Sequence, residues 1–135
     1  MAKNLKVCDL EGANLNIAVA LALGYERYSG PWWRHREHAE TMIDLNQYSP
    51  STNSQQGHDI IESDWISLER PSRGQKEPIW RAVMDNAAPR IGSQVYQTVV
   101  AQFGETALIA AMRAKVASVY GEVISSDLFK QSSAA

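Results

Sequence analysis

Residues Thr106–Gly121 read TALIAAMRAKVASVYG, and this stretch predicts an α-helix with two distinct apolar sides. Threonine is favoured at a helix N-cap and glycine just after a helix, so both outer residues mark helix ends. At about 100° per residue, the bulky side chains fall on one side and the alanines on the other. The bulky side suits a sheet, whereas small alanines allow a second helix to come close. We therefore expect this helix to lie between a sheet and another helix.

A second helix is predicted near the N-terminus, entered near Leu10 and stopped by Gly24. Its apolar residues point in almost every direction and are interrupted only by Asn14 and Asn16. A helix that is apolar all round belongs inside the fold. Because this helix is also rich in alanine, we expect it to pack directly on the alanine side of the C-terminal helix.

Short alternating runs between the two helices indicate β-strands. These runs are residues 41–45, 65–68 and 79–84, and a segment through Trp33 and His35. Together the elements predict an α+β fold, in which a small antiparallel sheet packs against the N-terminal and C-terminal α-helices. The 135 residues are expected to form a single domain, 1–135, with a polar tail over 126–135 that frays.

The segment 91–103 carries an ambiguous pattern. Ile91, Val95, Val99 and Phe103 recur every four residues, which favours a helix. Their β-branched content keeps a strand possible. We predict a helix here.

The composition argues against several classes of function. Lys and Arg total 13 against 15 Asp and Glu, and the sequence pI is near 5.9, so the basic excess of a duplex-DNA-binding protein is missing. The single cysteine, Cys8, excludes an internal disulfide and a cysteine zinc cluster. The longest apolar run, Ile17–Leu23, is far shorter than the ~18 residues that cross a membrane, and the N-terminus lacks a signal-peptide pattern. We expect a cytoplasmic protein with no membrane partner.

The uncharged run YSPSTNSQQG, residues 48–57, is the first candidate site. Its hydroxyl and amide groups can hold ribose hydroxyls, base edges or phosphate oxygens without a buried lysine. The plain alternative is a solvated connection rich in turn-forming residues. The candidate ligand-binding residues of this loop are Tyr48, Ser49, Pro50, Ser51, Thr52, Asn53, Gln56 and Gly57.

Trp32, Trp33 and Arg34 form the second candidate, because an aromatic face beside a cation could stack a purine and neutralise a phosphate. Neighbouring residues of a strand point to opposite faces, so at most one tryptophan enters a given site. The alternative is that both tryptophans fill the sheet core while Arg34 lies in solvent.

Arg113 is the third candidate, because it is a charged residue on a largely apolar helix. A guanidinium there needs a carboxylate or a ligand anion. A structural ion pair with Glu62 or Glu122 is the alternative to ligand binding.

No metal or catalytic site is predicted. His35 and His38 flank charged residues on what should be surface, and a metal site needs further ligands on a rigid frame. The phosphate-loop, dinucleotide-binding, zinc-protease and serine-hydrolase motifs are all missing from the sequence. We assign no metal, cofactor or catalytic residue and expect a protein that is not an enzyme.

Three blocks of the sequence occur in a recognisable order: LEGANLNIAVALALG at Leu10–Gly24, YSPSTNSQQGHDIIE at Tyr48–Glu62 and GETALIAAMRAKVASVYGEVI at Gly104–Ile124. They resemble the phage NinX-like proteins, a family of small proteins from lambdoid and related phages. Asn53-Ser54 stand where that family commonly has an Asp-Trp pair. The resemblance implies a phage protein that acts in an infected bacterium.

A shorter block starts at Pro50-Ser51 and continues through IIESDW, residues 60–65, into a predicted strand. It is similar to one end of small phage proteins that sequester nucleotide-derived immune signals such as cyclic ADP-ribose isomers. This resemblance implies a non-catalytic homo-oligomer that sequesters a polar, nucleotide-like small molecule as a counter-defence signal sponge. A protein-binding adaptor that modulates a host or phage enzyme, and a nucleotide-processing enzyme, stay open as alternatives.

Overall fold

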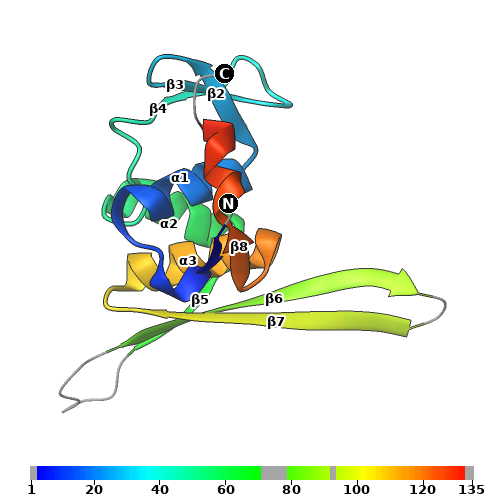
Figure 1. Ribbon diagram of the computed structural model, residues 1–135. Coiled ribbons are helices and arrows are strands. Elements are labelled where there is room, and N and C mark those ends of the chain that lie inside the picture. Colours follow the sequence, from blue (N-terminus) through cyan, green and yellow to red (C-terminus); the bar gives the residue numbers. More distant parts are fainter. Residues whose placement is uncertain (1–2, 71–78, 92–93, 133–135) are drawn as a thin grey trace.

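The computed structural model describes residues 3–70, 79–91 and 94–132, with only the backbone described over 85–91, 94–99 and 130–132. Within these residues it contains three α-helices and three antiparallel sheets, which confirms the α+β class (Figure 1). The strands are divided among separate sheets instead of forming the one small sheet that we expected. None of the helices in the described ranges is long and apolar enough to cross a membrane.

The central helix, α3, spans Ala107–Tyr120, and both of its predicted ends are confirmed. The Thr106 hydroxyl oxygen accepts a hydrogen bond from the Ile109 N–H at 3.1 Å, which caps the first turn. Gly121 follows the last turn with φ +87°, a conformation that favours glycine. Helix α3 packs on α1, Gly12–Ala22, as the alanine content predicts.

The sheet β5–β6–β7 packs against α3 (Figure 1). Its strands span Ser67–Glu69, Trp80–Ile91 and Gln94–Gly104. Ala82 and Met84 of β6 are buried in the same core cluster as Met112 of α3. The strand predicted over 79–84 is thus confirmed, and it continues well past that range.

The helix predicted over 91–103 is wrong. Most of that segment is β7, which pairs antiparallel with β6 from Trp80↔Gly104 to Ile91↔Gln94. A four-residue repeat also keeps side chains on one face of a strand, because strand side chains alternate with a period of two. Once β6 offers a partner, the β-branched residues of this segment favour the pleated sheet.

The sheet β2–β3–β4 is joined to the C-terminal end of α1. Its strands span Tyr25–Ser29, Trp32–His35 and Met42–Asp44, which confirms the strands predicted through Trp33 and over 41–45. Trp33 is only 1% exposed and packs with Ala20 and Leu21 of α1. This contact fixes the sheet on the helix.

Helix α2, Ser54–Ser63, was not predicted. It begins inside the uncharged run, with Asn53 as its N-cap, and packs against α3. The loop predicted over 48–57 therefore ends at Asn53. The sequence does carry a start signal for α2, because Asn53 is followed three residues later by Gln56, but the turn-forming residues around it favoured a loop prediction.

The two ends of the described chain lie together. Strand β1, Asn4–Lys6, pairs antiparallel with β8, Val123–Ser125, and the 3-10 helices η1, Val7–Asp9, and η2, Ser126–Ser132, follow them. Leu128 and Phe129 of η2 pack against the core, within the tail that was predicted to fray. Residues 133–135 of that tail lie outside the described residues.

Candidate functional site

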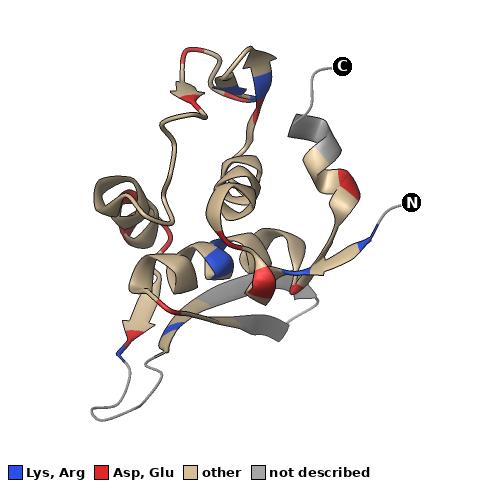
Figure 2. Cartoon of the chain, turned by 60° about the vertical axis from the view of Figure 1, so that its left-hand side comes forward, with Lys and Arg blue, Asp and Glu red and all other residues tan. Residues whose placement is uncertain are grey.

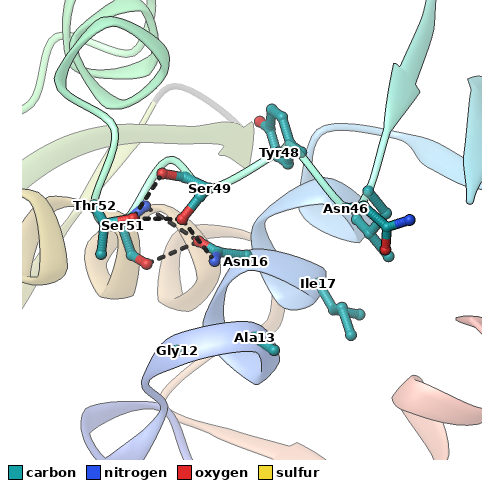
Figure 3. A pocket seen from close by; sticks show the side chains of 10 residues that line it. Gly12, Ala13, Asn16, Ile17, Asn46, Tyr48, Ser49, Ser51 and Thr52 are labelled. Carbon is teal, nitrogen blue, oxygen red and sulfur yellow. Dashed lines mark hydrogen bonds between the residues drawn. The ribbon is translucent and has the colours of Figure 1, made fainter.

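A cavity of about 530 Å³ lies between the N-terminal half of α1 and the connection from β4 to α2 (Figure 3). We call it the Asn16 cleft. A volume of this size falls within the roughly 300 to 1,000 Å³ of small-molecule sites. The residues that line it are Gly12, Ala13, Asn16, Ile17, Leu45, Asn46, Tyr48, Ser49, Ser51 and Thr52.

The Asn16 side chain joins the two walls of the cleft. Its amide oxygen accepts hydrogen bonds from the Ser51 N–H at 3.1 Å and from the Ser51 hydroxyl at 2.8 Å. Its amide nitrogen donates to the Ser49 hydroxyl at 3.2 Å. Asn16 and Ser51 are both buried, so each satisfies polar groups that would otherwise be costly to bury.

Asn16 was not among the predicted site residues. Its signal in the sequence is an amide within an otherwise apolar helix. A buried polar side chain requires partners, and here the partners lie in the uncharged loop. The sequence thus indicates that Asn16 needs a polar partner but does not identify Ser51 as that partner.

The loop is also held from the side of α2. The Ser49 N–H donates to the Gln56 side-chain oxygen at 2.6 Å, and the Gln56 amide donates to the Gln47 carbonyl at 3.2 Å. The Asn53 side-chain oxygen accepts from the Gln56 N–H at 3.0 Å and caps α2. Asn53 and Gln56, two predicted ligand residues, therefore shape the loop and do not line the cleft.

Pro50 and Gly57, also predicted, lie behind the cleft. Pro50 is fully buried. A Cβ at Gly57 would lie 2.5 Å from the Pro50 carbonyl oxygen and 2.5 Å from a methyl group of Leu108. Glycine at this position thus permits the close approach of α2 to α3 and to the loop.

Tyr48, Ser49, Ser51 and Thr52 are the predicted residues that do line the cleft. The Ser49 and Thr52 hydroxyls are hydrogen-bonded to each other (Figure 3). Tyr48 is half-buried beside Tyr25, with ring centroids 6.5 Å apart. Burial raises the pKa of the Tyr48 phenol above its ordinary value, and Tyr25 adds to the shift, so the phenol is neutral at physiological pH.

The lining of the Asn16 cleft contains no Asp, Glu, His, Cys, Lys or Arg. Its polar side chains are amides and hydroxyls, and Gly12 and Ala13 of the first turn of α1 also line it. N–H groups of a first helical turn have no intrahelical acceptor, and the Glu11 side chain does not cap them. The cleft can therefore hold a ligand through neutral donors and acceptors.

The tryptophan and arginine segment does not line the Asn16 cleft, although Ile17, Leu45 and Tyr48 of the lining pack against the core cluster that contains Trp33. Trp33 is in the core, whereas Trp32 is 45% exposed and does not line the cleft. The Arg34 guanidinium carbon lies 4.5 Å from the centroid of the Tyr28 ring. Strand alternation separates the two tryptophans as predicted, and none of Trp32, Trp33 and Arg34 lines the Asn16 cleft.

The Arg113 side chain links α3 to two other segments of the chain through hydrogen bonds. Its Nε donates to the Leu10 carbonyl at 2.9 Å and its Nη1 to the Phe103 carbonyl at 2.8 Å. The guanidinium therefore meets backbone carbonyls where a carboxylate was expected. Glu62, one suggested partner, instead lies 3.0 Å from His58 Nε2.

The histidines do not gather into a metal site within the part of the chain that is described, where no group of three or more potential His, Cys, Asp or Glu ligands occurs. His35 Nε2 lies 2.9 Å from the Leu23 carbonyl oxygen. Its Nδ1 accepts hydrogen bonds from the N–H groups of Glu37 and His38. His35 thus organises the turn that follows β3.

A comparison with protein-family models identifies a phage family. The family model described as "Bacteriophage P22, NinX" matches residues 6–119. A crystal structure of a phage protein from Bacillus cereus is similar with a TM-score of 0.48 and 17% sequence identity, over 82% of this chain and 88% of that chain. No curated protein sequence matches the chain.

Proposed function

The chain belongs to the bacteriophage P22 NinX family, and from this premise we propose that it binds a small, polar, nucleotide-like molecule in the Asn16 cleft without transforming it. In an infected bacterium such binding would withdraw the molecule from a host defence signal. The protein would then act as a counter-defence sponge in the cytoplasm.

The observation that carries this proposal is the chemistry of the cleft lining. General acid–base catalysis uses a group whose pKa lies near the operating pH. The only titratable lining residue is Tyr48, and its pKa is raised by burial. Ser49, Ser51 and Thr52 are hydroxyl groups without a base among the lining residues, so none is activated as a nucleophile. Binding without turnover is the function that this lining supports best.

A nucleotide-like ligand suits the distribution of groups in the cleft. Asn46 and Thr52 are exposed and offer an amide and a hydroxyl to sugar hydroxyls or base edges. Ile17 and Leu45 supply apolar surface for a ring. The first turn of α1 carries the positive end of the helix dipole, which favours a phosphate at Gly12 and Ala13.

The loop is preorganised for such binding. Asn16, Gln56 and Asn53 hold residues 49–53 from two helices, so little ordering is needed when a ligand enters. Preorganisation raises affinity because less conformational entropy is lost on binding. The predicted loop residues thus divide into those that build the wall and those that face the ligand.

Isothermal titration calorimetry with cyclic nucleotides and ADP-ribose derivatives tests the proposal. We expect binding of at least one compound, and recovery of the intact compound after the protein is heat-denatured. Recovery of an altered compound would instead identify a nucleotide-processing enzyme. Thr52→Val and Asn46→Ala should each weaken binding, whereas Trp32→Ala, which changes an aromatic residue outside the cleft, should not.

One observation favours the protein-binding adaptor as a second candidate. Trp65 follows α2 with φ +54° and is 88% exposed. A left-handed conformation is strained for a bulky residue, and exposed tryptophans are frequent anchors of protein interfaces. Helix α2 beside it contains Asp59 and Glu62 and no Lys or Arg (Figure 2). An apolar pocket with a basic rim would complement this surface.

The two functions respond to different substitutions. If the protein is a ligand sponge, Trp65→Ala leaves calorimetric binding intact and Thr52→Val reduces it. If it is an adaptor, the compound panel gives no heat, and Trp65→Ala reduces binding to a purified host or phage enzyme. The pair of variants therefore separates the Asn16 cleft from the α2 surface.

A further inference from the structure

Strand β7 is the long edge strand of the molecule within the described residues. It comes last in the order β5–β6–β7 and spans the 11 residues Gln94–Gly104. The strands at the other sheet ends, β1, β2, β4, β5 and β8, are three to five residues long. Short edge strands protect a protein from unwanted pairing, and β7 lacks that protection.

The sequence of β7 lacks the other usual protections as well. It contains no charged residue and no proline, whereas β6 contains Arg81, Asp85, Pro89 and Arg90. The register between β6 and β7 also shifts between Ala87 and Arg90. Charges, proline and such irregularities discourage strand addition. These features discourage strand addition along β6, whereas β7 has none of the charges or prolines that would prevent it.

Arg113 occupies one end of the unpaired edge of β7 and shows which backbone groups of this strand point away from β6. It donates to the Phe103 carbonyl, and η1 also packs against β7. In an antiparallel strand the N–H and C=O of one residue point to the same side, and the side alternates along the chain. The backbone groups of Val95, Gln97, Val99 and Ala101 therefore point outward with those of Phe103.

Beyond Val83, the β6–β7 hairpin has no third strand within the described residues, because β5 pairs only with Arg81–Val83 of β6. Figure 1 shows the far part of β6–β7 projecting beyond α3, away from the three helices. A two-stranded ribbon alone is marginally stable in water, and a third strand would complete its pairing. The pairing groups at the outer edge of β7 are therefore matched to an incoming β-strand.

We propose that the incoming strand is β7 of a second copy of this chain, paired antiparallel about a two-fold axis. A two-fold contact needs a surface that complements itself. Strand β7 meets this condition because it carries no charge that would repel its own copy. The product is one continuous sheet in the order β5–β6–β7–β7–β6–β5, with Arg113 closing each end of the shared edge.

Sedimentation equilibrium of the full chain tests the proposal. At micromolar protein concentration, the wild type is expected to sediment as a dimer, with twice its 15.0 kDa monomer mass. Val99→Pro removes an outward N–H from both copies and should raise the dimer dissociation constant by roughly a hundredfold. Val99→Thr keeps the N–H and the β-branch and should remain dimeric. A wild type that stays at 15.0 kDa, or a Val99→Pro variant that still dimerises, overturns the proposal.

Hydrogen exchange on the wild type gives a second readout that does not depend on the folding of a variant. Amides of Val95, Gln97, Val99 and Ala101 should exchange as slowly as the alternate amides that pair with β6, and should exchange faster on dilution. Fast exchange at the outward positions beside slow exchange at the inward positions would show an unpaired edge and overturn the proposal. Gln97→Lys, which places a like charge on both copies, should also dissociate the dimer.

Discussion

The carboxamide oxygen of Asn16 accepts two hydrogen bonds from Ser51, one from its backbone N–H at 3.1 Å and one from its hydroxyl at 2.8 Å. Both residues are buried, and 35 positions separate them in the chain. This pair attaches the uncharged loop to helix α1 and so creates one wall of the Asn16 cleft. Its chemistry leads to the first prediction.

Asn16→Leu should destabilise the protein by about 2 to 4 kcal/mol, because the Ser51 N–H and hydroxyl would remain buried without an acceptor. The free energy of unfolding from urea denaturation measures this loss. Asn14→Ala, an exposed substitution on the same helix, is the matched control and should change stability by no more than about 0.5 kcal/mol. Equal effects for the two variants would contradict the role assigned to Asn16.

Gly57→Ala should destabilise the protein by about 1 to 3 kcal/mol, since its Cβ would overlap the Pro50 carbonyl and Leu108. Leu108→Ala removes only one of these two obstacles. In a double-mutant cycle the combined variant should therefore recover part, and not all, of the clash energy. If the two destabilisations simply add, the Leu108 side chain contributes nothing to the cost of a Cβ at position 57.

Trp65→Gly should raise the free energy of unfolding by about 0.5 to 1 kcal/mol. The Ile66 N–H donates to the Ile61 carbonyl at 3.0 Å, and Trp65 occupies the left-handed position that closes α2, where glycine has no Cβ penalty. Trp65→Ala keeps the strained conformation and should give no such gain. A loss of stability in the glycine variant would show that the indole contributes packing despite its 88% exposure.

Arg113→Lys should destabilise the protein by about 1 to 2 kcal/mol and leave ligand affinity unchanged. Lysine keeps the charge but cannot reach the Leu10 and Phe103 carbonyls with the planar fork of a guanidinium. Denaturation and calorimetry on the same preparation separate the two effects. A stable variant with weakened binding would return Arg113 to the ligand site predicted from the sequence.

Stability should decline above pH 10, and Tyr48→Phe should reduce that decline. The unfolded phenol loses its proton near its ordinary pKa of 10.0, whereas burial raises the pKa of the folded phenol. The folded state therefore binds more protons in this window, so the free energy of unfolding falls as pH rises, by at most about 1.4 kcal/mol per pH unit for one phenol. Denaturation between pH 8 and pH 11 checks the slope. The pKa of Tyr25 is also raised by burial, so Tyr25 should account for part of the stability loss that persists in the Tyr48→Phe variant.

Local sequence signals determined the helices α1 and α3. Thr106, Gly121 and Gly24 act within one turn of their own positions, through a side-chain cap or a positive φ, so the ends of these helices were correctly predicted. The uncharged run from Tyr48 likewise indicated the loop that lines the Asn16 cleft. The buried partner of that loop, Asn16, was visible only as an unexplained amide in an apolar helix.

The tertiary structure alone decided the state of residues 94–104 and the composition of the cleft. A four-residue repeat places Val95, Val99 and Phe103 on one face of a helix or a strand alike, and the pairing with β6 selected the strand. Trp32 and Arg34 were separated from the loop because the inner face of β3 is occupied by Trp33 against α1. Both outcomes depend on contacts between segments far apart in the chain, whose free energy exceeds local conformational preference and is not contained in any short stretch of sequence.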